Sequence, residues 1–128
     1  METVVFLCVE NSCRSQIAEA FANKYGENKV IALSAGSKPS GKINENAIHL
    51  MKEFGCDLTR QKSTGISDLP KIEVHSIVSM GCGDKCPSIK TKRRIEWNIP
   101  DPKKMKLDEF RAVIEEIKIE VLNLLASI

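Results

Sequence analysis

The feature that most constrains this chain is the junction at residues 8–15, where one periodic pattern of apolar residues stops and another begins. Residues 3–7 are β-branched, aromatic or aliphatic and are typical of a buried strand. Residues 15–25 carry apolar side chains at helical spacing. The chain therefore passes from a strand through a short loop into a helix. Backbone N–H groups at such a junction, together with the helix dipole, favour a bound anion.

The loop carries two reactive side chains, Cys8 at its start and Arg14 at its end. The five residues between them let the loop curl so that the sulfur lies below a tetrahedral anion while the guanidinium holds two of its oxygens. The positive potential favours the thiolate of Cys8, which is the nucleophile. Ser15 is expected to cap the helix or to donate a hydrogen bond to the thiolate. The predicted anion-binding residues are Val9, Glu10, Asn11, Ser12, Cys13 and Arg14.

The length and charge of the chain limit the classes of protein to which it can belong. We expect residues 1–128 to form a single domain, since 128 residues suffice for a core. A formal net charge of +2 is too small to indicate a nucleic-acid-binding protein. The sequence has no apolar run of about 18 residues, which a membrane span needs, and no signal pattern. We therefore expect a cytoplasmic protein, by default a monomer.

Strand and helix patterns alternate along the rest of the chain. Strands are predicted at 30–34, 74–80 and 94–97, and helices at 44–54 and 107–125. This alternation predicts an α/β fold, a four-stranded parallel sheet flanked by helices. The core stripe of the last helix is predicted to be Leu107, Phe110, Val113, Ile114, Ile117, Val121, Leu124 and Ile128.

Three loops that carry reactive residues follow predicted strands, so they should meet at one edge of the sheet. The first follows Cys8, the second contains Cys82 and Cys86, and the third contains Asp101. Asp101 lies between two prolines. It is either a turn-forming residue or an acid that protonates a leaving oxygen.

The chain has five cysteines, an odd number that argues against a secreted disulfide framework. Cys82 and Cys86 are separated by three residues, whereas most zinc knuckles and thioredoxin-type motifs have a gap of two. With two histidines in the chain, a four-ligand zinc site is not expected, and no metal or cofactor is predicted. The pair is either two unrelated thiols or a redox pair, in which one thiol reaches Cys8 and the other resolves the disulfide.

These residues resemble the low-molecular-weight tyrosine phosphatase superfamily, and in particular its thioredoxin-coupled arsenate reductase branch. The resemblance covers nearly the whole chain. The matching segments are 11–19 (anion loop and first helix), 34–36 (end of the second strand), Cys82 with Cys86-Pro87 (resolving cysteines), and Trp97 with Asp101-Pro102 (general-acid loop).

The resemblance implies the low-molecular-weight phosphatase fold and the reduction of arsenate to arsenite by a three-cysteine relay. Cys8 attacks arsenate while Arg14 holds the anion and Asp101 protonates the leaving oxygen. Cys82 then attacks Cys8 and arsenite departs, after which Cys86 attacks Cys82. Thioredoxin, or a similar dithiol protein, reduces the Cys82–Cys86 disulfide.

The chain departs from the family at two positions. Glu10 stands where the family usually has glycine, which places a side chain and a negative charge near the anion. Some members bind potassium through residues matching Asn11, Glu19 and Ser34 plus an aspartate. Thr64 occupies the last position here, so no ion is predicted. Asn11 itself is implied to hold the loop in shape.

Two other functions remain as alternatives. A low-molecular-weight protein tyrosine phosphatase would hydrolyse phosphomonoesters through a Cys8 phosphoenzyme, but phosphotyrosine needs apolar or aromatic walls. Lys103 and Lys104 follow the Asp-Pro pair instead. An oxyanion- or metal-sensing binding module without turnover is disfavoured by the presence of Cys8, Arg14 and Asp101 together.

Overall fold

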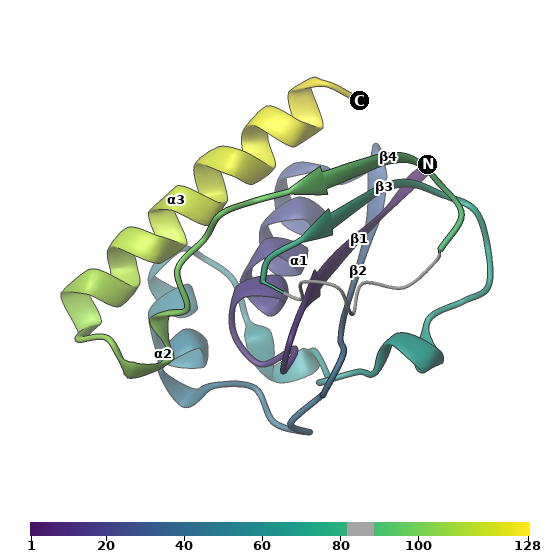
Figure 1. The fold of residues 1–128 in the computed structure, drawn as a ribbon. Helices are drawn as coiled ribbons and strands as arrows, with labels where there is room; N and C mark the ends of the chain where they lie inside the picture. The colour runs from purple at the N-terminus through teal and green to yellow at the C-terminus, as the bar shows by residue number, and fades with distance from the viewer. Residues whose placement is uncertain (82–88) are drawn as a thin grey trace.

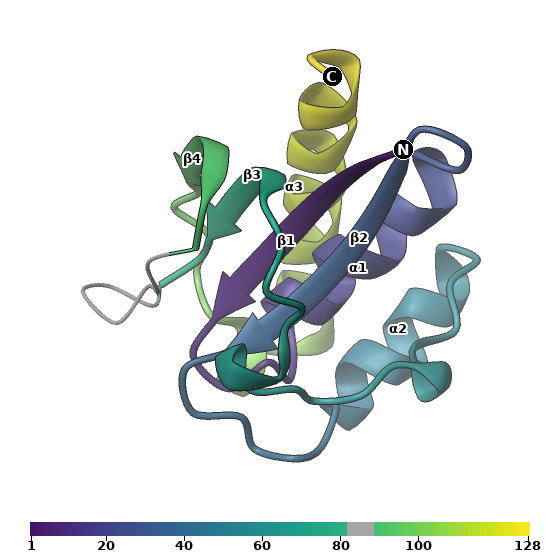
Figure 2. The ribbon, with the colours of Figure 1, turned by 90° about the vertical axis from the view of Figure 1, so that its right-hand side faces the viewer.

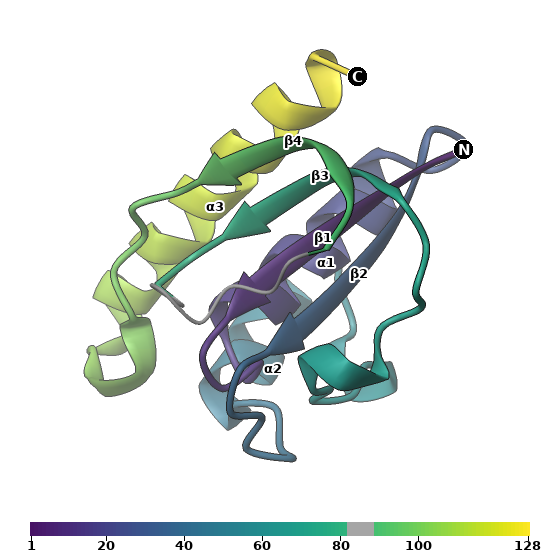
Figure 3. The same ribbon diagram turned by 45° about the vertical axis from the view of Figure 1, so that its right-hand side comes forward.

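The computed structural model describes residues 1–81 and 89–128. In these ranges, four parallel strands form one sheet in the order β2-β1-β3-β4. The strands are β1 (Glu2–Cys8), β2 (Val30–Gly36), β3 (Val74–Ser79) and β4 (Thr91–Glu96). All four arrowheads point the same way in Figure 3, so the carboxyl ends of the strands share one edge of the sheet. The predicted α/β fold with a four-stranded parallel sheet is confirmed.

The two faces of the sheet are covered unequally. Three helices, α1 (Arg14–Tyr25), α2 (Glu45–Glu53) and α3 (Leu107–Ala126), contribute to one hydrophobic cluster, and α1 and α3 lie along that face of the sheet (Figures 1 and 2). Side chains alternate along β1, as the strand geometry requires. Val4 and Phe6 belong to the helix-side cluster, whereas Val5 and Leu7 belong to a smaller cluster on the other face.

The short helix η2 (Ile66–Asp68) begins the segment that covers this second face. Ile66 and Leu69 pack against the smaller cluster, and Figure 2 shows the chain that leads from η2 into β3 passing in front of the strands. The crossover between β2 and β3 therefore covers the second face with few residues, while long helices cover the first.

The sequence-based boundaries are correct within two residues for every predicted strand and helix except β4. β4 begins at Thr91, three residues before the predicted start, and ends before Trp97. Leu107, predicted in the core stripe of α3, is 42% exposed, so this part of the prediction is wrong. It is the first residue of the helix, and the buried stripe begins one turn later at Phe110.

Within the described ranges, none of the helices has both the length and the apolar character that crossing a lipid bilayer would require.

Candidate active site

Cys8 ends the central strand β1, at the edge of the sheet where ligands bind in open parallel sheets. It pairs with Gly36 of β2, and its neighbour Leu7 pairs with Ser79 of β3. Residues 9–13 then form the anion loop, and α1 begins at Arg14. The nucleophile predicted from the sequence therefore lies between two strand ends and the N-terminus of a helix.

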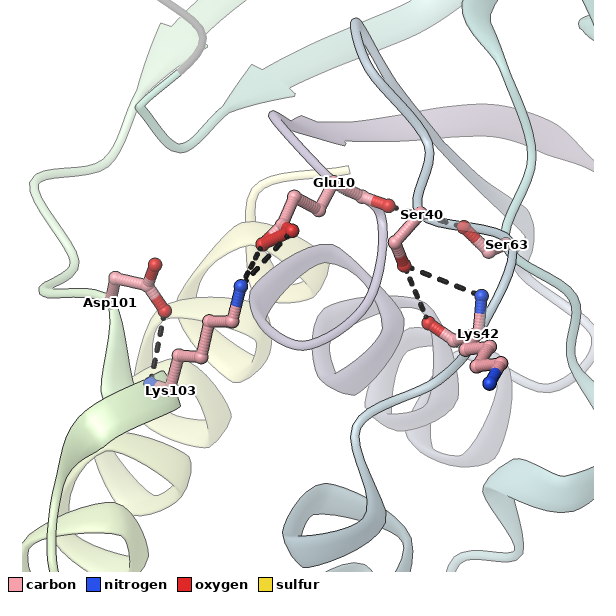
Figure 4. Close-up of polar contacts among 6 residues, drawn as sticks. All are labelled: Glu10, Ser40, Lys42, Ser63, Asp101 and Lys103. Atoms are coloured by element: carbon pink, nitrogen blue, oxygen red, sulfur yellow. Dashed lines mark hydrogen bonds and ion pairs between the residues drawn. The ribbon is translucent and has the colours of Figure 1, made fainter.

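The carbonyl groups of the anion loop are bound from outside by the segment that follows β2. The four backbone bonds are Ser37 N to Cys8 O (3.2 Å), Lys38 N to Val9 O (2.8 Å), Ser40 N to Glu10 O (3.0 Å) and Asn44 N to Ser12 O (2.9 Å). The hydroxyl of Ser63 donates to the same Glu10 oxygen at 3.1 Å (Figure 4). Among the described residues, the N–H groups of residues 9–16 find no acceptor. These donors can therefore serve a bound anion.

Asn11 holds the loop from behind, as the resemblance implies. Its φ of 50° lies in the left-handed region that asparagine tolerates better than most residues. Its amide nitrogen donates to Ser15 Oγ (2.7 Å) and Ser34 Oγ (2.9 Å). Its amide oxygen accepts from Thr64 N (2.7 Å) and Gln16 Nε2 (2.9 Å). The side chain is fully buried and does not line the cavity, so it shapes the loop and leaves the contact with an anion to its neighbours.

Ser15 contacts the nucleophile directly. Its Oγ lies 2.8 Å from Cys8 Sγ. Because the same Oγ accepts a hydrogen bond from Asn11, its own proton is free to point at the sulfur. Of the two predicted roles, the structure supports donation to the thiolate. Capping is wrong, since Ser15 lies inside α1 and Cys13 occupies the N-cap position without a side-chain cap.

The Arg14 side chain, at the end of the loop, is held by contacts with two other segments. Its Nη1 donates to the carbonyl oxygen of Ile99 at 3.0 Å. Gly81 lies against the guanidinium, because a Cβ at this position would come within 2.9 Å of Nη1. The φ of Gly81, +83°, also favours glycine. Two segments that are distant in sequence thus position the Arg14 side chain beside the loop.

A cavity of about 220 Å³ opens where these elements meet. Drug-sized ligands occupy sites of about 300 to 1,000 Å³, so this volume fits a small anion. The described residues that line it are Cys8, Val9, Glu10, Ser12, Cys13, Arg14, Asp101 and Lys103. The structure therefore brings the predicted nucleophile, guanidinium and acid into one cavity.

The structure confirms the turn-forming role of Asp101 and places the residue in the cavity lining. Asp101 precedes the short helix η4 (Pro102–Lys104), and its Oδ1 accepts the backbone N–H of Lys103 at 3.0 Å. The residue therefore does form the turn, and it also lines the cavity. In Figure 4 its second carboxylate oxygen points away from Lys103.

Glu10 forms an ion pair across the site. Its two carboxylate oxygens lie 2.9 and 3.2 Å from Lys103 Nζ, and this contact raises the pKa of Lys103 (Figure 4). Glu10 does not have a positive φ, so the loop does not require glycine at this position. The negative charge that the sequence places near the anion is thus paired with a lysine.

Cys13 also lines the cavity but is a poor nucleophile. Burial, followed by the negative charges of Asp101 and Cys8, raises the pKa of the Cys13 thiol to about 12. It is buried and therefore protonated at neutral pH.

Comparison with known proteins identifies the family to which a chain with this site belongs. Residues 3–128 match the model of the low molecular weight phosphotyrosine protein phosphatase family. The chain belongs to this family. Its members share the fold found here, and a phosphatase-family fold with Cys8 and Arg14 in one loop agrees with the resemblance deduced from the sequence.

The relatives of this phosphatase-family chain include proteins named for arsenate. The glutaredoxin arsenate reductase of Synechocystis sp. is 36% identical over 131 aligned residues, covering 100% of this chain and 99% of that protein. A solved structure of an arsenate reductase in the phosphate-binding state has a TM-score of 0.91 and 35% identity, covering 100% of this chain and 99% of the other. A thioredoxin-dependent arsenate reductase of Corynebacterium glutamicum has a TM-score of 0.81 and 30% identity, covering 99% of this chain and 61% of that chain.

The sequence did not indicate some of the site residues of this family member, and two of the predicted site residues lie outside the described ranges. Cys82 and Cys86 belong to the second group. The missed residues are Gln16, whose amide donates to Asn11 and to the Lys62 carbonyl, and Lys103 in its contact with Glu10. Gln16 lies in the segment 11–19 that matches the family, so its role could have been predicted from the sequence. The Lys103 contact joins residues 93 positions apart and leaves no local pattern.

Proposed function

We propose that this chain is an arsenate reductase that converts arsenate to arsenite with electrons from a dithiol protein of the thioredoxin or glutaredoxin class. The observation that carries the proposal is the small cavity, where Cys8, Arg14 and Asp101 meet beside unused backbone N–H donors. Relatives of matching length that are named arsenate reductases support arsenate as the oxyanion.

In the first step, the Cys8 thiolate attacks the arsenic atom and forms a sulfur–arsenic bond. Arg14 and the loop N–H groups bind the oxygens, and one oxygen leaves as water after Asp101 donates a proton. Support comes from the Ser15 hydroxyl, which lies 2.8 Å from the sulfur and stabilises its negative charge. The position of Asp101 in the cavity lining supports its role as the acid.

In the second step, Cys82 attacks the Cys8 sulfur and the sulfur–arsenic bond breaks. Its electron pair stays on arsenic, which leaves as arsenite, and a Cys8–Cys82 disulfide forms. Cys86 then attacks Cys82 and frees the Cys8 thiolate. These steps rest on the sequence pattern. Gly81, the last described residue before Cys82, packs against Arg14 of the site.

The proposal extends to the cell compartment and the oligomeric state of the protein. A relay of free thiols requires a reducing environment, which the cytoplasm provides. We place the protein there as a monomer of one domain, residues 1–128. Its partners are then arsenate and the dithiol reductant, with no role for nucleic acid or a membrane.

The test is arsenate-dependent oxidation of NADPH, with thioredoxin and its reductase in one assay and glutaredoxin, glutathione and glutathione reductase in another. Steady turnover is expected with at least one system. Cys8→Ser should abolish all reaction, because the nucleophile is lost. Cys82→Ser and Cys86→Ser should abolish multiple turnover while Cys8 still reacts with the anion.

Two results would contradict the proposal. Full cycling by either resolving-cysteine variant would exclude the relay. Hydrolysis of an aryl phosphate with no arsenate turnover in either assay would favour the alternative, a tyrosine phosphatase that works through a Cys8 phosphoenzyme. The Cys56→Ser variant is a matched control, since Cys56 is buried away from the cavity and its loss should not change turnover.

A further inference from the structure

The Glu10–Lys103 ion pair joins the two walls of the anion cavity. Glu10 comes from the anion loop, and Lys103 comes from the η4 turn that also carries Asp101. Both carboxylate oxygens of Glu10 are within 3.2 Å of Lys103 Nζ. Figure 4 shows the two side chains extended toward each other beside the Asp101 carboxylate. The pair therefore lies in the cavity lining beside the acid.

Such a pair contributes little to folding. The side chains of Lys103 and Glu10 are 52% and 38% exposed, and exposed ion pairs are weak because water and salt screen them. Its position matters more than its strength. Two charged side chains line the cavity, whereas a site for the ring of a phosphorylated tyrosine needs apolar walls.

The position of the ion pair matters because of the direction in which the leaving group departs. In a displacement at a tetrahedral centre, the attacking and leaving atoms lie roughly in line. Cys8 and Asp101 both line the cavity. With Asp101 as the acid of the proposed reaction, the leaving group departs toward Asp101. For arsenate the leaving group is a single oxygen. For an aryl ester it is an oxygen that carries a ring, and the ring would have to pass the Glu10–Lys103 pair.

We propose that the Glu10–Lys103 ion pair is a specificity determinant that restricts the cavity to unsubstituted tetrahedral oxyanions and disfavours esters with bulky leaving groups. The inference deepens the proposed function and rests on it, since arsenate is such an oxyanion. Neither residue is assigned a chemical step. They act by size and charge at the position that the leaving group must cross.

The experiment compares the binding of two probes by calorimetry to the reduced protein. The probes are inorganic phosphate and phenylphosphonate, an aryl analogue that cannot be hydrolysed. The quantity of interest is the ratio of the phenylphosphonate Kd to the phosphate Kd. In Glu10→Gly and in Lys103→Ala this ratio should fall about fivefold, or about 1 kcal/mol, the upper range for an exposed ion pair.

The two variants separate steric restriction from simple electrostatics. Glu10→Gly removes a negative charge and Lys103→Ala a positive one, so a purely electrostatic role would shift both Kd values together, in opposite directions in the two variants, and leave the ratio unchanged. The exchanged variant E10K/K103E should restore the wild-type ratio. Lys104→Ala is the matched control because it removes an exposed neighbouring lysine that does not line the cavity.

The outcomes are distinct. An unchanged ratio in either single variant, or an equal fall in Lys104→Ala, overturns the inference. Phosphate binding with the expected change in ratio, but no arsenate turnover by the wild-type protein, overturns the proposed function and leaves the restriction in place. A wild-type protein that binds neither probe overturns both. If Glu10→Gly fails to fold, Glu10→Ala removes the same side chain and charge without adding the backbone freedom of glycine.

Discussion

At the scale of the residue, Ser15 places its hydroxyl 2.8 Å from the reacting sulfur. A hydrogen bond to a charged group contributes about 1.5 to 3 kcal/mol. Ser15→Ala should therefore slow the reaction of Cys8 with arsenate by about tenfold or more. The measurement is the rate of thiol loss in a single turnover without reductant. An unchanged rate would show that the 2.8 Å contact does not stabilise the thiolate.

Ser37→Ala is the matched control for this variant. The Ser37 hydroxyl is a buried oxygen without a hydrogen-bond partner among the described residues, and its backbone N–H bond to Cys8 O survives the substitution. Its rate should stay at the wild-type value. A similar slowing in both variants would point to a general disturbance of the loop.

Single residues were predicted well where their role is local. Cys8, Arg14 and Ser15 lie within one short segment, and the change from strand to helical spacing was enough to place them together. Glu10 shows the limit. Its side chain lines the predicted anion cavity, but its partner Lys103 is 93 positions away, and only the packed fold determines that they meet.

At the scale of the element, Gly36 at the end of β2 sets how closely the anion loop approaches the sheet. A Cβ there would come within 2.5 Å of Val9 O and 2.8 Å of Asn11 N, both backbone atoms that cannot move independently. Gly36→Ala should destabilise the protein by about 2 kcal/mol in urea unfolding, as overpacking does. It should also lower arsenate turnover, because the loop must shift.

Gly65 provides the comparison for Gly36, its partner in an isolated parallel bridge. Its φ is −83°, and an added Cβ would meet no described atom closer than 3.4 Å. Gly65→Ala should therefore unfold at nearly the wild-type urea concentration. Equal losses in both variants would exclude the close approach at Gly36 as the cause.

Strands with apolar sequences were easier to predict than the charged edge strand β4. The hydrophobic runs of the inner strands β1 and β3 and of the other edge strand, β2, indicated nearly the full length of each. β4 was predicted too short because Lys92, Arg93 and Arg94 stand inside it. Charged residues are common in edge strands, where they discourage pairing with other chains, and they conceal the strand pattern.

At the scale of the whole molecule, Asn11 links the active-site loop to the stability of the fold. Its amide connects α1, β2 and the segment at Thr64. Asn11→Ala would leave several buried polar groups without partners, at about 1 to 3 kcal/mol each. Urea unfolding should show a loss about 3 kcal/mol larger than in Asn28→Ala. Asn28 also has a positive φ, 68°, but is exposed. Equal losses would mean that the backbone angle alone explains the asparagine.

The overall architecture was predictable because alternating strands and helices admit few arrangements, and the parallel sheet order places the reactive loops at one edge. The hydrogen-bond network was only partly predictable. The motif that contains Asn11 and Gln16 indicated a held loop, but nothing local in the sequence pairs Gln16 with Gln61 or with the Lys62 carbonyl. Such contacts depend on how the segment between β2 and β3 packs against α1.

The outer support of the anion loop has an evolutionary consequence. The segment after β2 grips the loop through main-chain atoms, at the carbonyls of Cys8, Val9, Glu10 and Ser12. Main-chain contacts survive most side-chain substitutions. Descendants of this protein can thus exchange the side chains that border the opening while inheriting an intact cradle.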